Sequence, residues 1–491
     1  MIASGASSHE TIIGLEIHIQ LKTCSKMFCG CRVEFGAPPN THVCPVCLGL
    51  PGALPVVNRR AIELAVRAAL ALNCTVHRSS FFARKNYFYP DLPKGYQISQ
   101  YDRPLASDGW LDFPEEGGGA GRVRIRRLHV EEDSGKSLHD RFAGKTAVDL
   151  NRAGVPLVEI VCEPDLRSPA AARAFLGRLK RVLEYLEVSD CNMEEGSLRV
   201  DANVSVRPAG SGELMTKTEV KNMNSFSQLE RALAYEAARH LTLVRSGEQV
   251  EPETMLWDPA RGEARPMRGK EEVHDYRYFP EPDLPRLEIT EDVVQRIGGS
   301  LPEMPWQKEQ RFIDDYGLPR YDAELLSSSR ALADLFEAVA RSVPDPKEAS
   351  NWVMVEVLAV ANESGRPVEQ LNVDPEGLAE IIGLVAGGRL SHSLGRQVFR
   401  RMVETGRSAG RLMEEEGLRL ASGDELELWV GEALAENPAE AERYRAGEQK
   451  LLAFFIGQVM RKSQGKADPG RARQALLERL GRASPPDTPG S

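Results

Sequence analysis

The chain has 491 residues, of which 42% are hydrophobic and 27% are charged, and its formal net charge is −10. This length predicts two to four domains, at roughly 100–200 residues each. The acidic balance argues against a protein that holds nucleic acid by its overall charge, but it does not exclude local basic patches on the surface. We see no apolar run near the ~18 residues that span a bilayer and no secretory pattern in residues 1–10, so we expect a cytoplasmic protein without a membrane partner.

The first 290 residues contain segments whose polarity alternates with a period of two, which is typical of half-buried strands. In residues 11–21, aliphatic side chains occupy one face, while Glu16 and His18 share the other face. Two further segments, 122–130 and 197–206, alternate similarly, and helices are predicted at 59–72, 170–186 and 228–244. Strands and helices do not alternate regularly, so we predict an α+β domain on an antiparallel or mixed sheet.

Prolines are frequent between residues 280 and 305, which predicts a domain boundary at 285–305. Beyond residue 306 the pattern is helical, without clear strands. The last helix is predicted to begin with Asp468 as N-cap and Pro469 at its first position. Residues 483–491 are typical of a frayed tail.

Four of the eight cysteines form two close pairs, Cys29 with Cys31 and Cys44 with Cys47, separated by twelve residues. Two such pairs can enclose one tetrahedral zinc ion as four thiolates, which would make the site structural because no coordination position stays open. The alternative is four unrelated buried thiols. The closeness of the pairs favours a zinc knuckle.

Carboxylates recur in the predicted strands of this first region. Glu16 and His18 could hold Mg²⁺ or Mn²⁺ together, although an exposed strand face explains the pair equally well. Further acids occur at 131–133, 159–163 and 194–195. Glu159 lies in an apolar run, where an unpaired charge would be costly. A metal site for nucleotide phosphates and a set of salt bridges with nearby arginines both stay open.

Two segments combine features of nucleic-acid binding. Residues 84–103 mix five aromatic residues with Arg84, Lys85, Lys94 and Arg103, which suits base stacking but also an ordinary packed loop. Residues 461–482 hold seven basic and two acidic residues, a net charge of +5. This basic segment could contact an RNA backbone or be a solvated face.

Long motifs run in order from about residue 11 to residue 480. They include GLEIHIQL, KMFCGC, CPVC, RKNYFYPDLPKGYQISQYD, RLHVEEDSGKS, DLNRAGVPLVEIVCEPD, MEEGSLRVDANVSVRP, EVKNMNSF, DYRYFPEPDL, SNWVM and FFIGQVMRKSQGKADP. Together these motifs resemble the B subunits of the bacterial aspartyl/glutamyl-tRNA amidotransferases.

The resemblance implies an enzyme that works in a heterotrimer with a glutamine-cleaving, amidase-type A subunit and a small C subunit. Its activity would be the ATP-dependent conversion of misacylated Glu-tRNA(Gln) and/or Asp-tRNA(Asn) through an acyl phosphate that ammonia attacks. A non-discriminating aminoacyl-tRNA synthetase would be a further partner. The alternative is a tRNA-binding scaffold without catalytic residues.

The resemblance also implies domains and site residues. The domains would be a cradle at 1–292, an all-α helical domain at 293–410, a small helical tail domain at 411–480 and a flexible tail at 481–491. The implied cofactors are ATP, Mg²⁺ and a structural Zn²⁺. We predict catalytic roles for Glu16, His18, Glu132, Lys85 and Lys94, with Lys85 facing Glu132 as a gate for ammonia. We assign Mg²⁺ to Glu16, His18, Glu132 and Glu159, Zn²⁺ to Cys29, Cys31, Cys44 and Cys47, and tRNA contacts to Arg461, Lys462, Lys466, Arg471 and Arg473.

Overall fold

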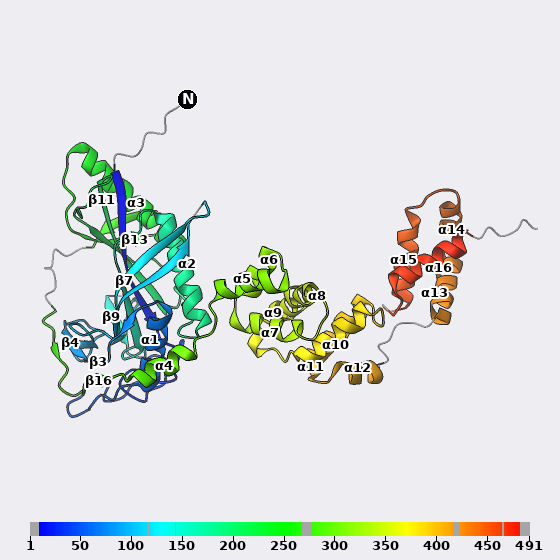
Figure 1. The fold of residues 1–491 in the computed structure, drawn as a ribbon. Coiled ribbons are helices and arrows are strands. Elements are labelled where there is room, and N and C mark those ends of the chain that lie inside the picture. Colours follow the sequence, from blue (N-terminus) through cyan, green and yellow to red (C-terminus); the bar gives the residue numbers. More distant parts are fainter. Residues whose placement is uncertain are drawn as a thin grey trace, which may run out of the picture. The chain divides into compact units, whose positions relative to one another are not determined.

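The computed structural model describes residues 9–115, 117–142, 144–267, 276–416, 423–463 and 466–481. The chain divides into two compact units, Met1–Met304 and Pro305–Ser491, and each is described by itself. The first unit combines sheets and helices, and the described part of the second is helical, so the predicted α+β class is confirmed (Figure 1). The division after Met304 falls at the end of the predicted boundary region. The four-way partition into cradle, helical domain, tail domain and flexible end stays a prediction, and residues 482–491 lie outside the described part.

A nine-stranded sheet organises the first unit, with the strand order β14-β13-β12-β11-β1-β10-β7-β6-β2. All neighbouring strands in it are antiparallel except β12 and β13, which are parallel. The strands are β1 (His9–Gln20), β2 (Thr75–Val76), β6 (Ala106–Pro114), β7 (Ala120–Glu132), β10 (Pro156–Cys162), β11 (Leu198–Pro208), β12 (Thr218–Lys221), β13 (Thr254–Asp258) and β14 (Glu263–Pro266). The three strands predicted from alternation are thus confirmed as β1, β7 and β11.

Three helices cover the apolar side of this sheet. The helix α1 (Arg59–Ala71) packs against β6 and β7, α2 (Pro169–Tyr185) against β6, and α3 (Phe226–Ser246) against β11 and β14. Each begins at a polar N-cap whose side chain accepts hydrogen bonds from the first turn, namely Asn58, Ser168 and Ser225. The helices leave the opposite face of β1, with its polar side chains, free of this core.

Short sheets and one more helix complete the first unit. These are β4 (Ala83–Asn86) with β5 (Tyr96–Ser99) and β15 (Phe279–Pro280), β3 (Ser79–Ser80) with β16 (Leu287–Glu288), β8 (Lys136–Phe142) with β9 (Lys145–Asp149), and α4 (Glu291–Gly299). The Arg84 guanidinium donates to both carboxylate oxygens of Glu281, at 2.7 and 2.9 Å, and lies 4.2 Å from the Tyr96 ring centre. This bidentate pair joins the segment after residue 276 to the β4–β5 hairpin.

The described part of the second unit contains two separate hydrophobic cores. One core runs from Phe312 to Leu412 and the other from Leu426 to Leu480. The elements are α5 (Pro305–Tyr316), α6 (Arg320–Leu326), α7 (Arg330–Ala340), α8 (Pro346–Trp352), a π-helix (Val353–Val357), α9 (Leu358–Ser364), a 3₁₀-helix (Val368–Gln370), α10 (Pro375–Ala386), α11 (His392–Thr405), α12 (Ala409–Glu416), α13 (Gly423–Glu436), α14 (Pro438–Arg445), α15 (Leu451–Lys462) and α16 (Pro469–Gly481). Asp468 caps α16 as predicted, because its carboxylate accepts from the Arg471 amide at 2.8 Å. Within the described segments, every helix is too short or too polar to traverse a bilayer.

A buried ionic network fastens α3 to the sheet strand β12. The Thr218 hydroxyl donates to Glu236 at 2.6 Å and lies 3.0 Å from His240 Nε2, while Arg239 also pairs with Glu236. Burial by itself raises the pKa of Glu236, but hydrogen bonds from His240, Arg239 and Thr218 hold that pKa at about 2. Ionised Glu236 therefore stabilises the folded state.

We expect Glu236→Ala to destabilise the first unit by about 3 kcal/mol, because it removes one partner from a buried ionic network. Differential scanning calorimetry of the purified chain would measure the shift. The control is Glu230→Ala, which breaks the more exposed pair with Arg173 and should cost at most about 1 kcal/mol.

The contribution of Glu236 should depend on pH with a defined sign. Its folded pKa lies below the ordinary value of 4.5, so its stabilising effect is present in full above about pH 4.5 and is lost as pH falls toward about 2. This assignment would be contradicted if the difference in stability between Glu236→Ala and the native chain grew as the pH was lowered.

Candidate active site and metal centres

The polar face of the central sheet gathers ionisable side chains from five adjacent strands. Residues directly opposite one another in paired strands share a face. His18 of β1 is opposite Glu159 of β10 and Arg199 of β11, and Glu159 is in turn opposite His129 of β7. The same face carries Glu16, Gln20, Glu131, Asp201, Asn203, Glu219 and Lys221. The two-residue period thus builds a charged surface on the side opposite the hydrophobic core.

A cluster of His18, Glu131 and Glu159 lies on this face. One ligand atom from each residue falls within 4.8 Å of the others. His18 Nε2 is 3.4 Å from Glu159 and 3.8 Å from Glu131, and His129 Nε2 lies 3.3 and 3.6 Å from the same two carboxylates. Both carboxylates are buried: the side chain of Glu131 is 2% exposed and that of Glu159 is 8% exposed. One nitrogen and two carboxylate ligands in this arrangement suit a divalent cation such as Mg²⁺ or Mn²⁺.

The cluster is held together by opposing charges. Desolvation by itself raises the pKa of Glu131 and of Glu159, but hydrogen bonds and charge from the histidines hold both pKa values below the ordinary range. Conversely, burial acts to lower the pKa of His129, and the two carboxylates raise it to about 9. The pKa of His18 is raised in the same way. A metal ion would compete with protons for His18, because imidazole binds metal in its neutral form.

Positive side chains border the cluster. Arg199 donates to Asp133 at 2.9 Å, and Gln20 donates to the same carboxylate at 2.9 Å. Lys221 donates to Asp201 at 2.7 Å. These contacts hold a guanidinium on the strand next to His18 and an ammonium two strands from His18 on the same face, where both could pair with phosphate oxygens.

Lys85 and several tyrosine rings lie near the cluster. Lys85 Nζ lies 4.7 Å from the ring centre of Tyr276, and the rings of Tyr101 and Tyr278 stack at 4.1 Å. Burial acts to lower the pKa of Lys85, but Glu131 and other neighbouring charges raise it overall, so Lys85 stays charged. The 84–103 segment therefore packs as an aromatic-lined hairpin that brings one ammonium near the His18–Glu131–Glu159 cluster.

The structure brings His18 and Glu159 together as predicted, but it does not place Glu132 with them. Successive strand residues point to opposite faces, so Glu131 and not Glu132 joins His18. Glu132 instead forms a buried ion pair with Lys94 and accepts from the Ile98 amide at 2.8 Å. The period of β7 was the signal that could have identified Glu131. The predicted pairing of Lys85 with Glu132 is likewise not seen, since Lys94 takes that position.

Glu16 lies on the same face as His18 but outside the cluster. It accepts from Asn203 at 3.3 Å and lines a cavity of about 230 Å³. Arg126 and Lys217 add positive charge to this cavity, and Leu214 and Met215 add apolar surface. Such a lining suits a ligand with an apolar ring and an anionic group.

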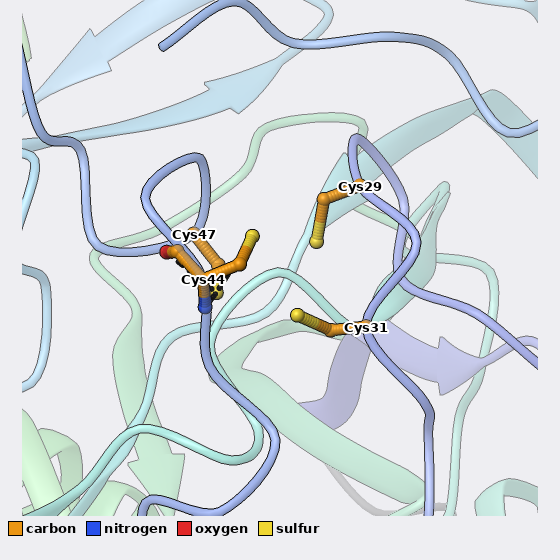
Figure 2. Close-up of side chains that lie close together, drawn as sticks. All are labelled: Cys29, Cys31, Cys44 and Cys47. Carbon is orange, nitrogen blue, oxygen red and sulfur yellow. Dashed lines mark hydrogen bonds between the residues drawn. The ribbon is translucent and has the colours of Figure 1, made fainter.

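The four predicted cysteines converge in the loop between β1 and α1 (Figure 2). All four sulfur atoms lie within 4.8 Å of one another, and Cys44 Sγ is 3.8 Å from Cys47 Sγ. A tetrahedron of sulfurs about 2.3 Å from zinc has edges of about 3.8 Å, so this spacing fits zinc. The Cys44 amide also donates to Cys47 Sγ at 3.1 Å.

The cysteine cluster favours a thiolate at Cys47. A hydrogen bond from Cys29 lowers the pKa of Cys47 to about 4, and the Lys26 ammonium contributes to the lowering. Burial raises the pKa of Cys31 to about 11. A zinc ion would bind all four as thiolates, and with four protein ligands its role would be structural.

Residues 11–295 match the family described as the GatB/GatE catalytic domain, and residues 334–480 match the one described as the GatB domain. The B subunit of the aspartyl/glutamyl-tRNA(Asn/Gln) amidotransferase of Thermoanaerobacter sp. (strain X514) is 51% identical over 473 residues, which cover 96% of this chain and 99% of that protein. The chain belongs to this family. The protein of the same name from Thermodesulfovibrio yellowstonii is 50% identical with the same coverage, and that from Moorella thermoacetica is 51% identical over 475 residues.

Membership in the amidotransferase B-subunit family confirms the resemblance drawn from the motifs. It makes the chain a subunit of a ligase-type enzyme that forms carbon–nitrogen bonds. Both parts of the chain are covered, the sheet unit by the catalytic-domain match and most of the helical unit by the second match. The cluster at His18 therefore lies in the part of the family described as catalytic.

The basic residues predicted to contact RNA differ in their surroundings. Lys462 is engaged within its own unit, because it pairs with Glu432 at 3.3 Å and Glu436 at 2.6 Å. Arg461, Arg471 and Arg473 are exposed, Lys466 is half-buried, and the described residues offer these four no ion-pair partner. The three exposed arginines are thus the ones available to a polyanion.

Manganese(II) binding, followed by electron paramagnetic resonance, tests the grouping of ligands at His18. We expect Glu131→Gln and Glu159→Gln each to weaken Mn²⁺ binding by at least about tenfold, because each removes an anionic ligand. The matched control is Glu132→Gln, a neighbouring buried carboxylate that pairs with Lys94. If Glu131→Gln and Glu132→Gln lowered the Mn²⁺ affinity equally, the grouping of ligands would be wrong.

Proposed function

We propose that this chain carries out the ATP-dependent transamidation of misacylated Glu-tRNA(Gln) and/or Asp-tRNA(Asn) to Gln-tRNA(Gln) and Asn-tRNA(Asn). The observation that carries the proposal is the buried His18–Glu131–Glu159 cluster on the polar face of the sheet. This cluster lies within the segment that matches the catalytic domain of the family. The names of the relatives supply the substrate class, aspartyl- and glutamyl-tRNA.

The chemistry requires activation of a carboxylate. Ammonia cannot displace oxide from a carboxylate, so the side-chain carboxylate of the tRNA-borne amino acid must first receive a phosphoryl group from ATP. The acyl phosphate then loses phosphate when ammonia attacks its carbonyl carbon, and the products are an amide, ADP and phosphate. Magnesium held by His18, Glu131 and Glu159 would screen the phosphate charge that opposes the first transfer.

Other residues of the chain divide the remaining tasks. Arg199 is placed to orient anionic groups beside the cluster, Lys221 lies farther along the same polar face, and the cavity at Glu16 suits part of the nucleotide. Lys85 remains charged next to Glu131, where it can stabilise the anionic carboxylate as it is activated. The family resemblance assigns Lys94 and Glu132, which form a buried ion pair, to the entry point of ammonia.

The proposed assembly supplies what this chain lacks. An amidase-type A subunit would release ammonia from glutamine, a small C subunit would complete the heterotrimer, and a non-discriminating synthetase would deliver the misacylated tRNA. The relatives are named as B subunits, which implies that they work with other polypeptides. We place this reaction in the cytoplasm, where tRNA is aminoacylated.

The proposal is tested with the enzyme assembled from this chain and the A and C subunits. Amide formation on both misacylated tRNAs should require ATP and release one ADP per amide, with either glutamine or ammonium as nitrogen source. Glu131→Gln should lower kcat at least about 100-fold with both nitrogen sources, because it disrupts metal-assisted phosphoryl transfer. Ammonium is informative because it bypasses the glutaminase step.

The exposed carboxylate of Glu194 supplies the control, and Glu194→Gln should leave the rate unchanged. An unaltered rate for Glu131→Gln with tRNA binding intact would instead support a scaffold protein without catalytic residues. Amide formation on free glutamate without RNA would also overturn the proposal.

The exposed arginines of the last helices should contribute to tRNA affinity. Replacing Arg461, Arg471 and Arg473 with alanine should weaken binding of the assembled enzyme to tRNA about tenfold. The slope of log K against log salt concentration should also fall by about one for each phosphate contact that is lost. Filter binding at several salt concentrations measures both effects. Arg443→Ala removes an exposed arginine that already pairs with Glu448 and serves as the control. An unchanged salt slope in the triple variant would contradict the assignment.

A further inference from the structure

Lys26 is a fully buried lysine next to the cysteine cluster. Its exposed fraction is 0%, which is rare for lysine unless the ammonium is paired with an anion. The Nζ atom donates to the carbonyl oxygens of His42 at 2.7 Å and Leu150 at 3.3 Å. Among the described residues, no carboxylate lies within ion-pair distance of Nζ. Two neutral carbonyls accept from two of its three N–H groups and do not compensate its charge.

The contacts of Lys26 join both cysteine pairs to the sheet. Its amide donates to the Cys31 carbonyl at 2.9 Å, and its ammonium bonds to His42, two residues before Cys44. The third contact, Leu150, leads from β9 toward β10. A single residue therefore contacts the segments of both cysteine pairs and the segment that follows β9.

Gly154 shows how closely the lysine approaches the thiols. A methyl group on its α-carbon would lie 3.5 Å from Lys26 Cδ and 3.6 Å from Cys47 Cβ, and its φ of +87° also disfavours other residues. The side chains of Lys26 and Cys47 thus converge on one point of the backbone. Glu132 Oε2 lies 3.8 Å from the same methyl position, but its carboxylate is already paired with Lys94. The cysteine cluster is therefore the anionic group left to pair with this ammonium.

We propose that Lys26 is the internal counter-ion of a zinc tetrathiolate formed by Cys29, Cys31, Cys44 and Cys47. Four thiolates and one Zn²⁺ ion carry a net charge of −2, and this charge is costly to bury. The ammonium of Lys26 halves the charge, and the dianion in turn supplies the partner that the ammonium lacks. The pairing explains why a lysine occupies a fully buried position. It does not depend on the proposed transamidation.

Zinc affinity is the direct test. In the full chain assembled with the A and C subunits, competition with a chromogenic chelator should show that Lys26→Met weakens zinc binding by about 10- to 100-fold, as expected for loss of an outer partner of a metal site. The control is Lys22→Met, an exposed lysine four residues earlier, which should bind zinc as the native chain does. Unchanged affinity in Lys26→Met would overturn the proposal, as would a native chain that binds no zinc.

A double-mutant cycle separates charge pairing from a merely structural role and remains informative if Lys26→Met is unstable. Lys26→Met is made in the native chain and in a Cys44→Ser/Cys47→Ser chain that cannot form the tetrathiolate, and thermal unfolding is compared. Charge pairing predicts a large drop in Tm in the zinc-bound chain and little drop, or a rise, where the dianion is gone. Equal drops in both chains would show that Lys26 only holds the loop through its hydrogen bonds and would overturn the proposal. Neither measurement involves amide formation.

Discussion

The two-residue period of β1 is the constraint on which the first unit depends. The strand lies between β10 and β11 in the middle of the sheet, and its isoleucine and leucine side chains on one face are almost completely buried. The same backbone necessarily presents Glu16, His18 and Gln20 on the other face. A one-residue shift in register would bury these polar groups under the helices and expose the core, so the hydrophobic effect also determines the position of the candidate active site.

The charged face is stable because its opposite charges are interleaved. Glu131 and Glu159 are close enough to repel each other, and their burial would normally favour protonation. Two histidines, Lys85 and Arg199 compensate for that repulsion through the contacts described above. The charges of this face are thus oriented before any ligand binds, as the proposed binding of an anionic substrate and a divalent cation requires.

The loop between β1 and α1 depends on a different kind of stabilisation. It contains little regular secondary structure and several exposed apolar residues, including Leu54 and Val56. Its order comes from the converging thiols, from Lys26 and from the Asn58 side chain, which donates to the Ser25 and Lys26 carbonyls at 3.0 and 3.1 Å. Metal and hydrogen bonds can order a segment of this kind, which adds only a few residues such as Met27 and Phe28 to the hydrophobic core.

The sequence by itself determined the fold class, the main strands and helices, the cysteine cluster and the family, because these depend on local period, capping and spacing. It also identified His18 and Glu159 as candidates. The period of β7 separates Glu131 from its neighbour Glu132, but only the tertiary structure decided that Glu131 meets His18 and Glu159, because that contact depends on how β7 and β1 pair with β10. The same holds for Lys94, Lys26 and Lys462: their partners come from distant segments, and no local pattern reveals whether a lysine meets a carboxylate, a carbonyl or a cluster of thiols.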